Sequence, residues 1–118
     1  MATASQVLTG LVLLLHVYFL VLEMFLWATP FGMKTFKRSR EEQESTKVLA
    51  ANQGLYNGFL AAGLAWSYVA STGHDIRVFF LVCVVVAGLY GAATAARSIL
   101  FAQALPAAAA LVVTLLAR

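Results

Sequence analysis

The chain has 118 residues, of which 62% are hydrophobic and 11% are charged, and its mean hydropathy is +0.86. Because average soluble domains carry roughly a quarter charged residues, this composition excludes an ordinary water-soluble domain and predicts one membrane domain covering residues 1–118. The net charge of +3 comes largely from one basic segment, and the single Cys83 excludes an intrachain disulfide and a cysteine metal site.

The first apolar run extends from about Ser5 to Ala28 and is long enough to cross a hydrocarbon layer of ~30 Å. It has no positively charged start, and it is about twice as long as the apolar region of a signal peptide, so we predict a retained helix. Pro30 marks its end, since proline disfavours helix for the residue before it. Two ionisable side chains, His16 and Glu23, interrupt the run.

A charged segment over residues 30–47 follows the first predicted helix, and we expect it to be a loop. Its basic residues are Lys34, Lys37, Arg38, Arg40 and Lys47. The positive-inside rule then places this loop in the cytoplasm and both termini outside. Three glutamates lie among the bases and no aromatic platform accompanies them, so anionic lipid is the expected partner and nucleic acid is not.

Three more apolar runs complete the expected fold, an all-α bundle of four transmembrane helices. They cover about Val48–Ala70, Arg77–Ala96 and Ser98–Ala117. The second and third are separated by the turn residues STGHD. Only Arg97 and Ser98 divide the third from the fourth, and Pro106 is expected to kink or begin the last helix.

Each predicted helix carries polar residues in the half that lies toward the basic segment. Counting about 1.5 Å per residue places Glu23 roughly 8 Å inside the first helix. The layer comprises Glu23, Asn52, Gln53, Tyr56, Asn57, Tyr90, Thr94 and Gln103, with His16 near mid-membrane. Because polar side chains are costly in lipid unless they face one another or water, we predict an intramembrane polar pocket on the cytoplasmic side.

Helical spacing assigns roles within this pocket. Steps of four, three and four residues place His16, Glu23 and Trp27 on one stripe of the first helix. We predict that Glu23 donates or accepts a proton, with His16 and Tyr56 as the other catalytic candidates. The candidate ligand-binding residues are Asn52, Gln53, Asn57, Phe19, Trp27, Tyr90, Arg97 and Gln103.

Structural readings of the same residues stay open. Glu23 can instead form an ion pair with Arg97, or act as a neutral acid bonded to Asn52 or Tyr56. The amides can simply bridge helices. No metal site is predicted, because the two histidines lie in separate segments; a haem held by His16 alone is an alternative.

Three blocks of the sequence resemble a known family: HVYFLVLEMFLWATPFGMKTF, ANQGLYNGFLAAGLAW and GLYGAATAARSILFAQALPA. They are similar to the signature blocks of small bacterial four-helix membrane proteins, a domain of unknown function (number one-three-zero-four). The resemblance implies a multi-pass protein of the bacterial inner membrane with no established activity. A fainter likeness is to the membrane-embedded styrene oxide isomerases, whose haem-ligating histidine is replaced here by Asn52.

Three classes of function follow as hypotheses. The first is a pocket that binds, and in its catalytic version isomerises, a lipophilic small molecule. The alternatives are a non-catalytic membrane interaction protein and a proton-coupled exporter similar in plan to the small multidrug transporters. Two pairs of glycines form small-residue faces that favour close helix packing and a homo-oligomer. They are Gly54 with Gly58, and Gly88 with Gly91.

Overall fold

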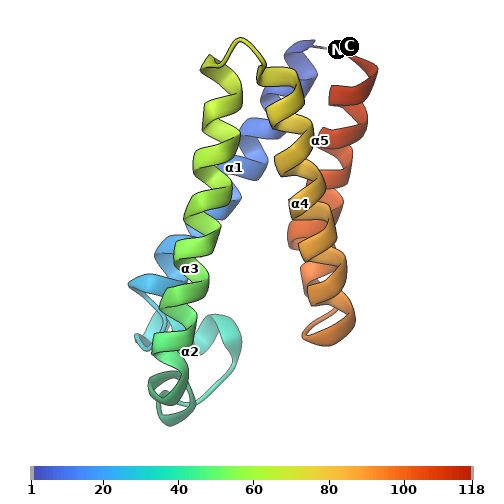
Figure 1. Ribbon diagram of the computed structural model, residues 1–118. Coiled ribbons are helices and arrows are strands. Elements are labelled where there is room, and N and C mark those ends of the chain that lie inside the picture. The colour runs from blue at the N-terminus through green and yellow to red at the C-terminus, as the bar shows by residue number, and fades with distance from the viewer. Residues whose placement is uncertain (1, 118) are drawn as a thin grey trace. The chain divides into compact units, whose positions relative to one another are not determined.

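The computed structural model describes residues 2–117, and it is helical apart from short turns, with no strand among these residues (Figure 1). The all-α prediction is therefore confirmed. The elements are α1 (Ala2–Met24), α2 (Pro30–Phe36), α3 (Arg40–Val69), α4 (Gly73–Thr94), the π-helical turn η1 (Leu100–Ala104) and α5 (Leu105–Leu116).

Two of these helices, α1 and α4, are long and apolar enough to cross a membrane. The stretch Leu100–Leu116 is also apolar but shorter. The longest helix, α3, has its apolar run interrupted by Asn52, Gln53 and Asn57. Two of the four predicted spans therefore meet the requirement of length and hydropathy, whereas the four-span bundle and its orientation stay predictions.

The chain divides into two compact parts, which are described separately. The central part is His16–Phe59, and the terminal part combines the residues up to Leu15 with those from Leu60 onward. The division falls inside α1 and α3, so each of these helices contributes residues to both parts.

The terminal part is built on a core of small and branched side chains. Its fully buried members are Val12, Leu64, Leu81, Val84, Ala107 and Ala110. In this part α4 packs against η1 and α5, and α4 and α5 run side by side (Figure 1). The alanines of α5 carry little bulk, so they let the two helices approach closely.

The buried residues of each helix recur at steps of three and four, which is the spacing of one helix face. We call each such set a buried stripe. The stripe of α1 is Ser5, Thr9, Val12 and His16, that of α3 is Ala50, Gly54, Asn57, Ala61, Leu64 and Ser67, and that of α4 is Gly73, Arg77, Leu81, Val84 and Gly88. Polar and small residues occupy much of these stripes, as membrane helix contacts favour.

The boundary between the last two predicted helices differs from expectation. We predicted helices to Ala96 and from Ser98, whereas α4 ends at Thr94 and η1 begins at Leu100. The Leu105 amide donates to the Leu100 carbonyl, five residues back. Pro106 has no amide proton to give the carbonyl four residues earlier, and its ring crowds that carbonyl, so a widened turn before it relieves both problems.

The segment 30–47, predicted as a loop, is mostly helical in the structure. Thr29 Oγ1 accepts the Gly32 amide at 3.4 Å, and Pro30 opens α2 at a position where its missing amide proton is not needed. α2 ends at Phe36 and is capped by Lys37, which has φ 55°, and α3 begins at Arg40. The density of charge in this segment marks where the apolar run stops, but it does not break a helix.

A reciprocal capping box starts α3. The Glu42 amide donates to Ser39 Oγ at 3.1 Å, and the Ser39 amide donates to Glu42 Oε1 at 2.9 Å. The hydrogen bond from the Ser39 backbone, with a second from its side chain, holds the pKa of the Glu42 carboxyl below its ordinary value of 4.5. The pKa of Glu42 is lower in the folded chain than in the unfolded chain. The capping box therefore stabilises the folded chain at pH values above 4.5, and this stabilisation is lost as the pH falls through the lower, folded-state pKa.

We expect Ser39→Ala to increase amide hydrogen exchange in the first turn of α3 roughly fivefold, since a lost cap costs about 1 kcal/mol. Hydrogen exchange followed by mass spectrometry at neutral pH measures this. The control is Ser45→Ala, because the Ser45 hydroxyl donates to the Glu42 carbonyl at 2.8 Å inside the helix and caps nothing. Equal exchange in both variants would contradict the capping role.

Candidate functional site

The central part brings together two of the predicted site residues, Glu23 of α1 and Asn57 of α3. Asn57 Nδ2 donates to Glu23 Oε1 at 2.5 Å, and Asn57 is only 5% exposed. Gly54, one turn earlier on α3, allows this approach, because a Cβ there would lie 2.6 Å from Met24 Cγ and 3.2 Å from Glu23 Cβ. The carboxyl group of a half-buried acid thus meets a neutral amide.

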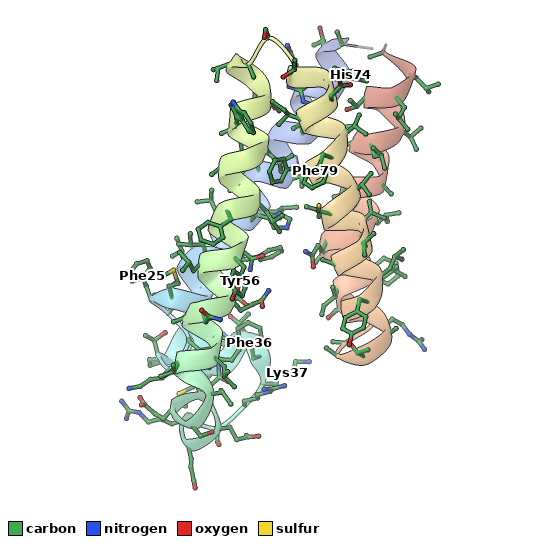
Figure 2. All side chains as sticks on the ribbon, in the orientation of Figure 1. Phe25, Phe36, Lys37, Tyr56, His74 and Phe79 are labelled. Carbon is green, nitrogen blue, oxygen red and sulfur yellow. The ribbon has the colours of Figure 1, made fainter. Side chains whose placement is uncertain are left out.

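This partner differs from the predicted ones. The sequence suggested Asn52 or Tyr56 for a neutral hydrogen bond and Arg97 for an ion pair. Asn52 and Tyr56 are exposed, and Figure 2 labels Tyr56 on α3. Asn57 takes their place because it lies on the buried stripe of α3, whereas Asn52 and Tyr56 share a different face. Arg97 is an exposed residue of the terminal part.

His16 and Trp27, predicted to share a stripe with Glu23, have different surroundings. His16 is completely buried, and its ring lies 5.3 Å from that of Phe19 in an edge-on contact. Trp27 lies beyond the end of α1. Its indole contacts the Phe36 ring at 4.6 Å and donates to Thr46 Oγ1 at 3.1 Å, and its carbonyl accepts Gln43 Nε2 at 2.8 Å. Trp27 therefore ties α2 and the start of α3 together.

The other predicted site residues lie mainly at the surface of the chain. Asn52, Gln53, Tyr56, Tyr90 and Arg97 are exposed, and Phe19 and Gln103 are half-buried. Three of the predicted residues, Tyr90, Arg97 and Gln103, belong to the terminal part, and the other eight belong to the central part. The predicted pocket thus corresponds to two groups of residues in different parts.

A polar cluster that the sequence did not predict lies in the terminal part, around Arg77. This residue is 9% exposed. Its Nε donates to Ser67 Oγ at 3.2 Å, one terminal nitrogen donates to Ser5 Oγ at 3.1 Å, and its guanidinium carbon lies 4.5 Å from the centre of the Tyr68 ring. Tyr68 itself donates to the Gln6 carbonyl. One buried cation thus joins residues of α1, α3 and α4.

The cluster continues to α5 through hydroxyl groups. Ser5 Oγ and Thr114 Oγ1 are 2.6 Å apart, and both residues are buried. His74 Nε2 lies 3.1 Å from the Thr114 carbonyl, and because a carbonyl only accepts, this nitrogen carries the proton. Neither Arg77 nor His74 is among the predicted site residues. The available signal was spacing, since Arg77 precedes Leu81 and Val84 by four and seven residues.

Metal-binding groups of three or more His, Cys, Asp or Glu do not occur within residues 2–117. The haem alternative at His16 stays a prediction.

Two comparisons with known proteins match most of the chain. The sequence model of a family described as "Protein of unknown function (DUF1304)" matches residues 10–115. The chain is also similar to "Uncharacterized protein YpaA" of Lactococcus lactis subsp. lactis (strain IL1403), with 30% identity over 106 residues that cover 87% of this chain and 89% of the relative. No solved structure matches it. Neither match supports the fainter likeness to styrene oxide isomerases.

Proposed function

The chain belongs to the DUF1304 family of proteins of unknown function, and we propose that it is a multi-pass protein of the bacterial inner membrane that binds a lipophilic small molecule beside Glu23 and Asn57. The observation that carries the proposal is the 2.5 Å hydrogen bond between an acid and a neutral amide on two apolar helices. A catalytic version, in which Glu23 moves a proton during isomerisation, uses the same pair.

The distribution of apolar side chains supports lipid as the solvent. On α1, Val7 and Leu14 are each 65% exposed, whereas Ser5 and Thr9 are buried. Large apolar residues are likewise exposed on α4. Soluble monomers rarely expose contiguous apolar surfaces of this extent, and a bilayer removes their cost. The basic segment 34–47 then supplies the cytoplasmic contact with anionic lipid.

The chemistry of the Glu23–Asn57 pair suits an apolar ligand with one polar group. A carboxyl group accepts hydrogen bonds, and a primary amide offers two donors and an acceptor. Side by side, they can satisfy one hydroxyl, carbonyl or ether oxygen of a ligand whose remainder contacts hydrocarbon. In a medium without water each such bond orients the ligand strongly, because no solvent competes for the same groups.

The packing of glycines supports the structural alternative, a non-catalytic interaction protein. A Cβ at Gly58 would lie 2.7 Å from Leu20 Cδ1, and one at Gly54 would meet Met24. Both glycines therefore fit α3 against α1 within the chain, and in this account Asn57 only fastens the two helices. Association into a homo-oligomer is part of either proposal.

Infrared difference spectroscopy of the protein in lipid nanodiscs separates these accounts. We expect 1-decanol to shift a carboxyl band that is missing from Glu23→Gln, and decane, which has no polar group, to leave it in place. Asn57→Leu should raise the decanol concentration needed about fivefold, since one hydrogen bond contributes roughly 1 kcal/mol. Tyr90→Phe is the control, because Tyr90 is 71% exposed and belongs to the terminal part.

A carboxyl band that never responds to decanol, together with a lowered melting temperature in Glu23→Gln, would favour the structural alternative. Proton release on addition of a ligand, measured with a pH dye in detergent solution and absent from Glu23→Gln, would instead favour the proton-coupled exporter.

A further inference from the structure

A cavity of about 160 Å³ lies in the terminal part, beside the Arg77 cluster. Ser5, Ser67, His74, Arg77 and Thr114 contribute to its wall, and Figure 2 labels His74 at the start of α4. We propose that this cavity binds an anionic group of the phosphate class. The site shares no residue with the Glu23–Asn57 pair, so it adds a second ligand to the proposed function.

The argument starts from the charge of Arg77. Its guanidinium is buried, and the contacts described above are two hydroxyl groups and one aromatic ring, all of them neutral. Lys47 forms an ion pair with Glu44, and His74 Nδ1 lies 3.6 Å from Asp75 Oδ1; neither contact includes Arg77. Since buried charges are normally paired, and arginine matches phosphate in geometry and charge, an oxyanion in the adjoining cavity would compensate this cation.

The hydroxyl groups extend the positive field from Arg77 to the far wall of the cavity. Arg77 donates to Ser5 Oγ, so the Ser5 hydroxyl proton can be given to Thr114 Oγ1, 2.6 Å away. Thr114 then has its own hydroxyl proton to donate to a ligand. Gly73, the first residue of α4, also lines the cavity, so the positive end of that helix faces the same space.

An acidic residue, Asp75, follows His74 at the start of α4. Asp75 is the neighbouring carboxylate; its side chain is 71% exposed, and Oδ1 lies 3.6 Å from His74 Nδ1. His74 Nε2 already donates to the Thr114 carbonyl. His74 thus contacts both Asp75 and Thr114, while Arg77 contacts the hydroxyl groups of Ser5 and Ser67.

The size of the cavity limits the ligand. Its 160 Å³ is below the roughly 300 Å³ at which sites for drug-sized molecules begin, and it equals about five waters' share of liquid volume. A phosphate group fits such a space, whereas a whole lipid or nucleotide does not. The phosphate can therefore be a free ion or the headgroup of a phospholipid whose tails lie in the bilayer.

Titration with inorganic phosphate tests whether the cavity binds a free phosphate ion. The protein is held in an uncharged maltoside detergent, the ionic strength is kept constant with chloride, and the melting temperature is followed by tryptophan fluorescence. A ligand that binds only the folded state raises this temperature. We expect a rise in the natural sequence and in Arg97→Gln, whose arginine is exposed, and none in Arg77→Gln.

Thr114→Val keeps the cation and the shape of the side chain but removes one hydroxyl. It should require about ten times more phosphate for the same rise, which corresponds to one hydrogen bond to a charged group. This variant carries the test if Arg77→Gln fails to fold. An unchanged phosphate response in Thr114→Val would overturn the proposal, as would an equal loss of response in Arg97→Gln.

Native mass spectrometry tests whether the cavity binds the headgroup of a phospholipid. Protein reconstituted in vesicles of equal parts phosphatidylcholine and phosphatidylglycerol is released in the gas phase, and retained phospholipid is counted. One combination of results would assign the site to a phospholipid headgroup. In it, phosphate does not change the melting temperature, and phospholipid is retained by the natural sequence and by Arg97→Gln but lost from Thr114→Val. Absence of both responses would refute an anion site.

Discussion

Gly88→Ala should lower the free energy of unfolding by about 2 kcal/mol, although alanine is the better helix former. A Cβ at this position would lie 2.7 Å from Cβ and N of Ala104 and 2.8 Å from its Cα. Two of these three atoms are backbone, so α4 and η1 must move apart. Overpacking of this kind costs about 1–3 kcal/mol, which exceeds the gain of up to about 1 kcal/mol from replacing a helical glycine.

Gly91→Ala is the matched control one turn later on α4. There a Cβ would meet only the Ile99 side chain, at 3.2 Å, and a side chain can rotate aside. We expect this variant to be as stable as the natural sequence or slightly more so. Equilibrium unfolding of both variants in detergent micelles, followed by circular dichroism, gives the comparison. A stable Gly88→Ala would mean that α4 and η1 do not pack as closely as described.

Hydropathy predicted the helical class and the approximate position of each long helix, but it did not predict where the helices end. It locates the stretch suited to lipid, and α3 continues beyond that stretch into Arg40, Glu41, Glu42 and Gln43. These residues have high helix propensity, and the Ser39–Glu42 capping box starts the helix ahead of them. The apolar runs therefore identified the segment 30–47 as the connection between two predicted spans, but they did not predict that most of it is helical.

The pairing of Glu23 with α3 illustrates what spacing can and cannot predict. An acid on α1 and amides on α3 could be assigned to one polar layer, but choosing among Asn52, Gln53 and Asn57 requires knowing which face of α3 is buried. The steps from Ala50 to Gly54, Asn57 and Ala61 mark that face once small residues are weighted as packing residues. The spacing of small residues is visible in the sequence, but a pattern of hydrophobic residues alone does not show it.

The Arg77 cluster was missed for a related reason. Positive-inside counting treats each arginine as a charge on one side of the membrane, so it ignores which helix face the residue occupies. Arg77 lies on the buried stripe of α4, and Ser5 and Ser67 lie on the stripes of α1 and α3. The contacts among them depend on the tertiary packing of helix ends that are distant in sequence, which spacing within one helix cannot supply.

Leu64→Ala should produce the other large loss of stability, and its size reports on the solvent around the chain. Leu64 is completely buried, together with Leu81 and Val84 of α4 and small residues of α5. In water-soluble cores such a truncation costs about 2–5 kcal/mol, the sum of a transfer term and a cavity term. In a membrane the separated helix faces lipid that is as apolar as the core, so the transfer term largely disappears while lost packing contacts remain.

We therefore expect Leu64→Ala to cost about 2 kcal/mol in bicelles, at the lower end of the range for soluble cores. Leu89→Ala is the control, since Leu89 is 52% exposed on α4 and its truncation should change stability by less than about 0.5 kcal/mol. Reversible unfolding from bicelles by increasing amounts of anionic detergent measures both. A loss near 5 kcal/mol at Leu64 would indicate a core driven together by water, and equal losses at the two leucines would place Leu64 outside the core. A moderate loss confined to Leu64 is what packing between helices already surrounded by hydrocarbon requires.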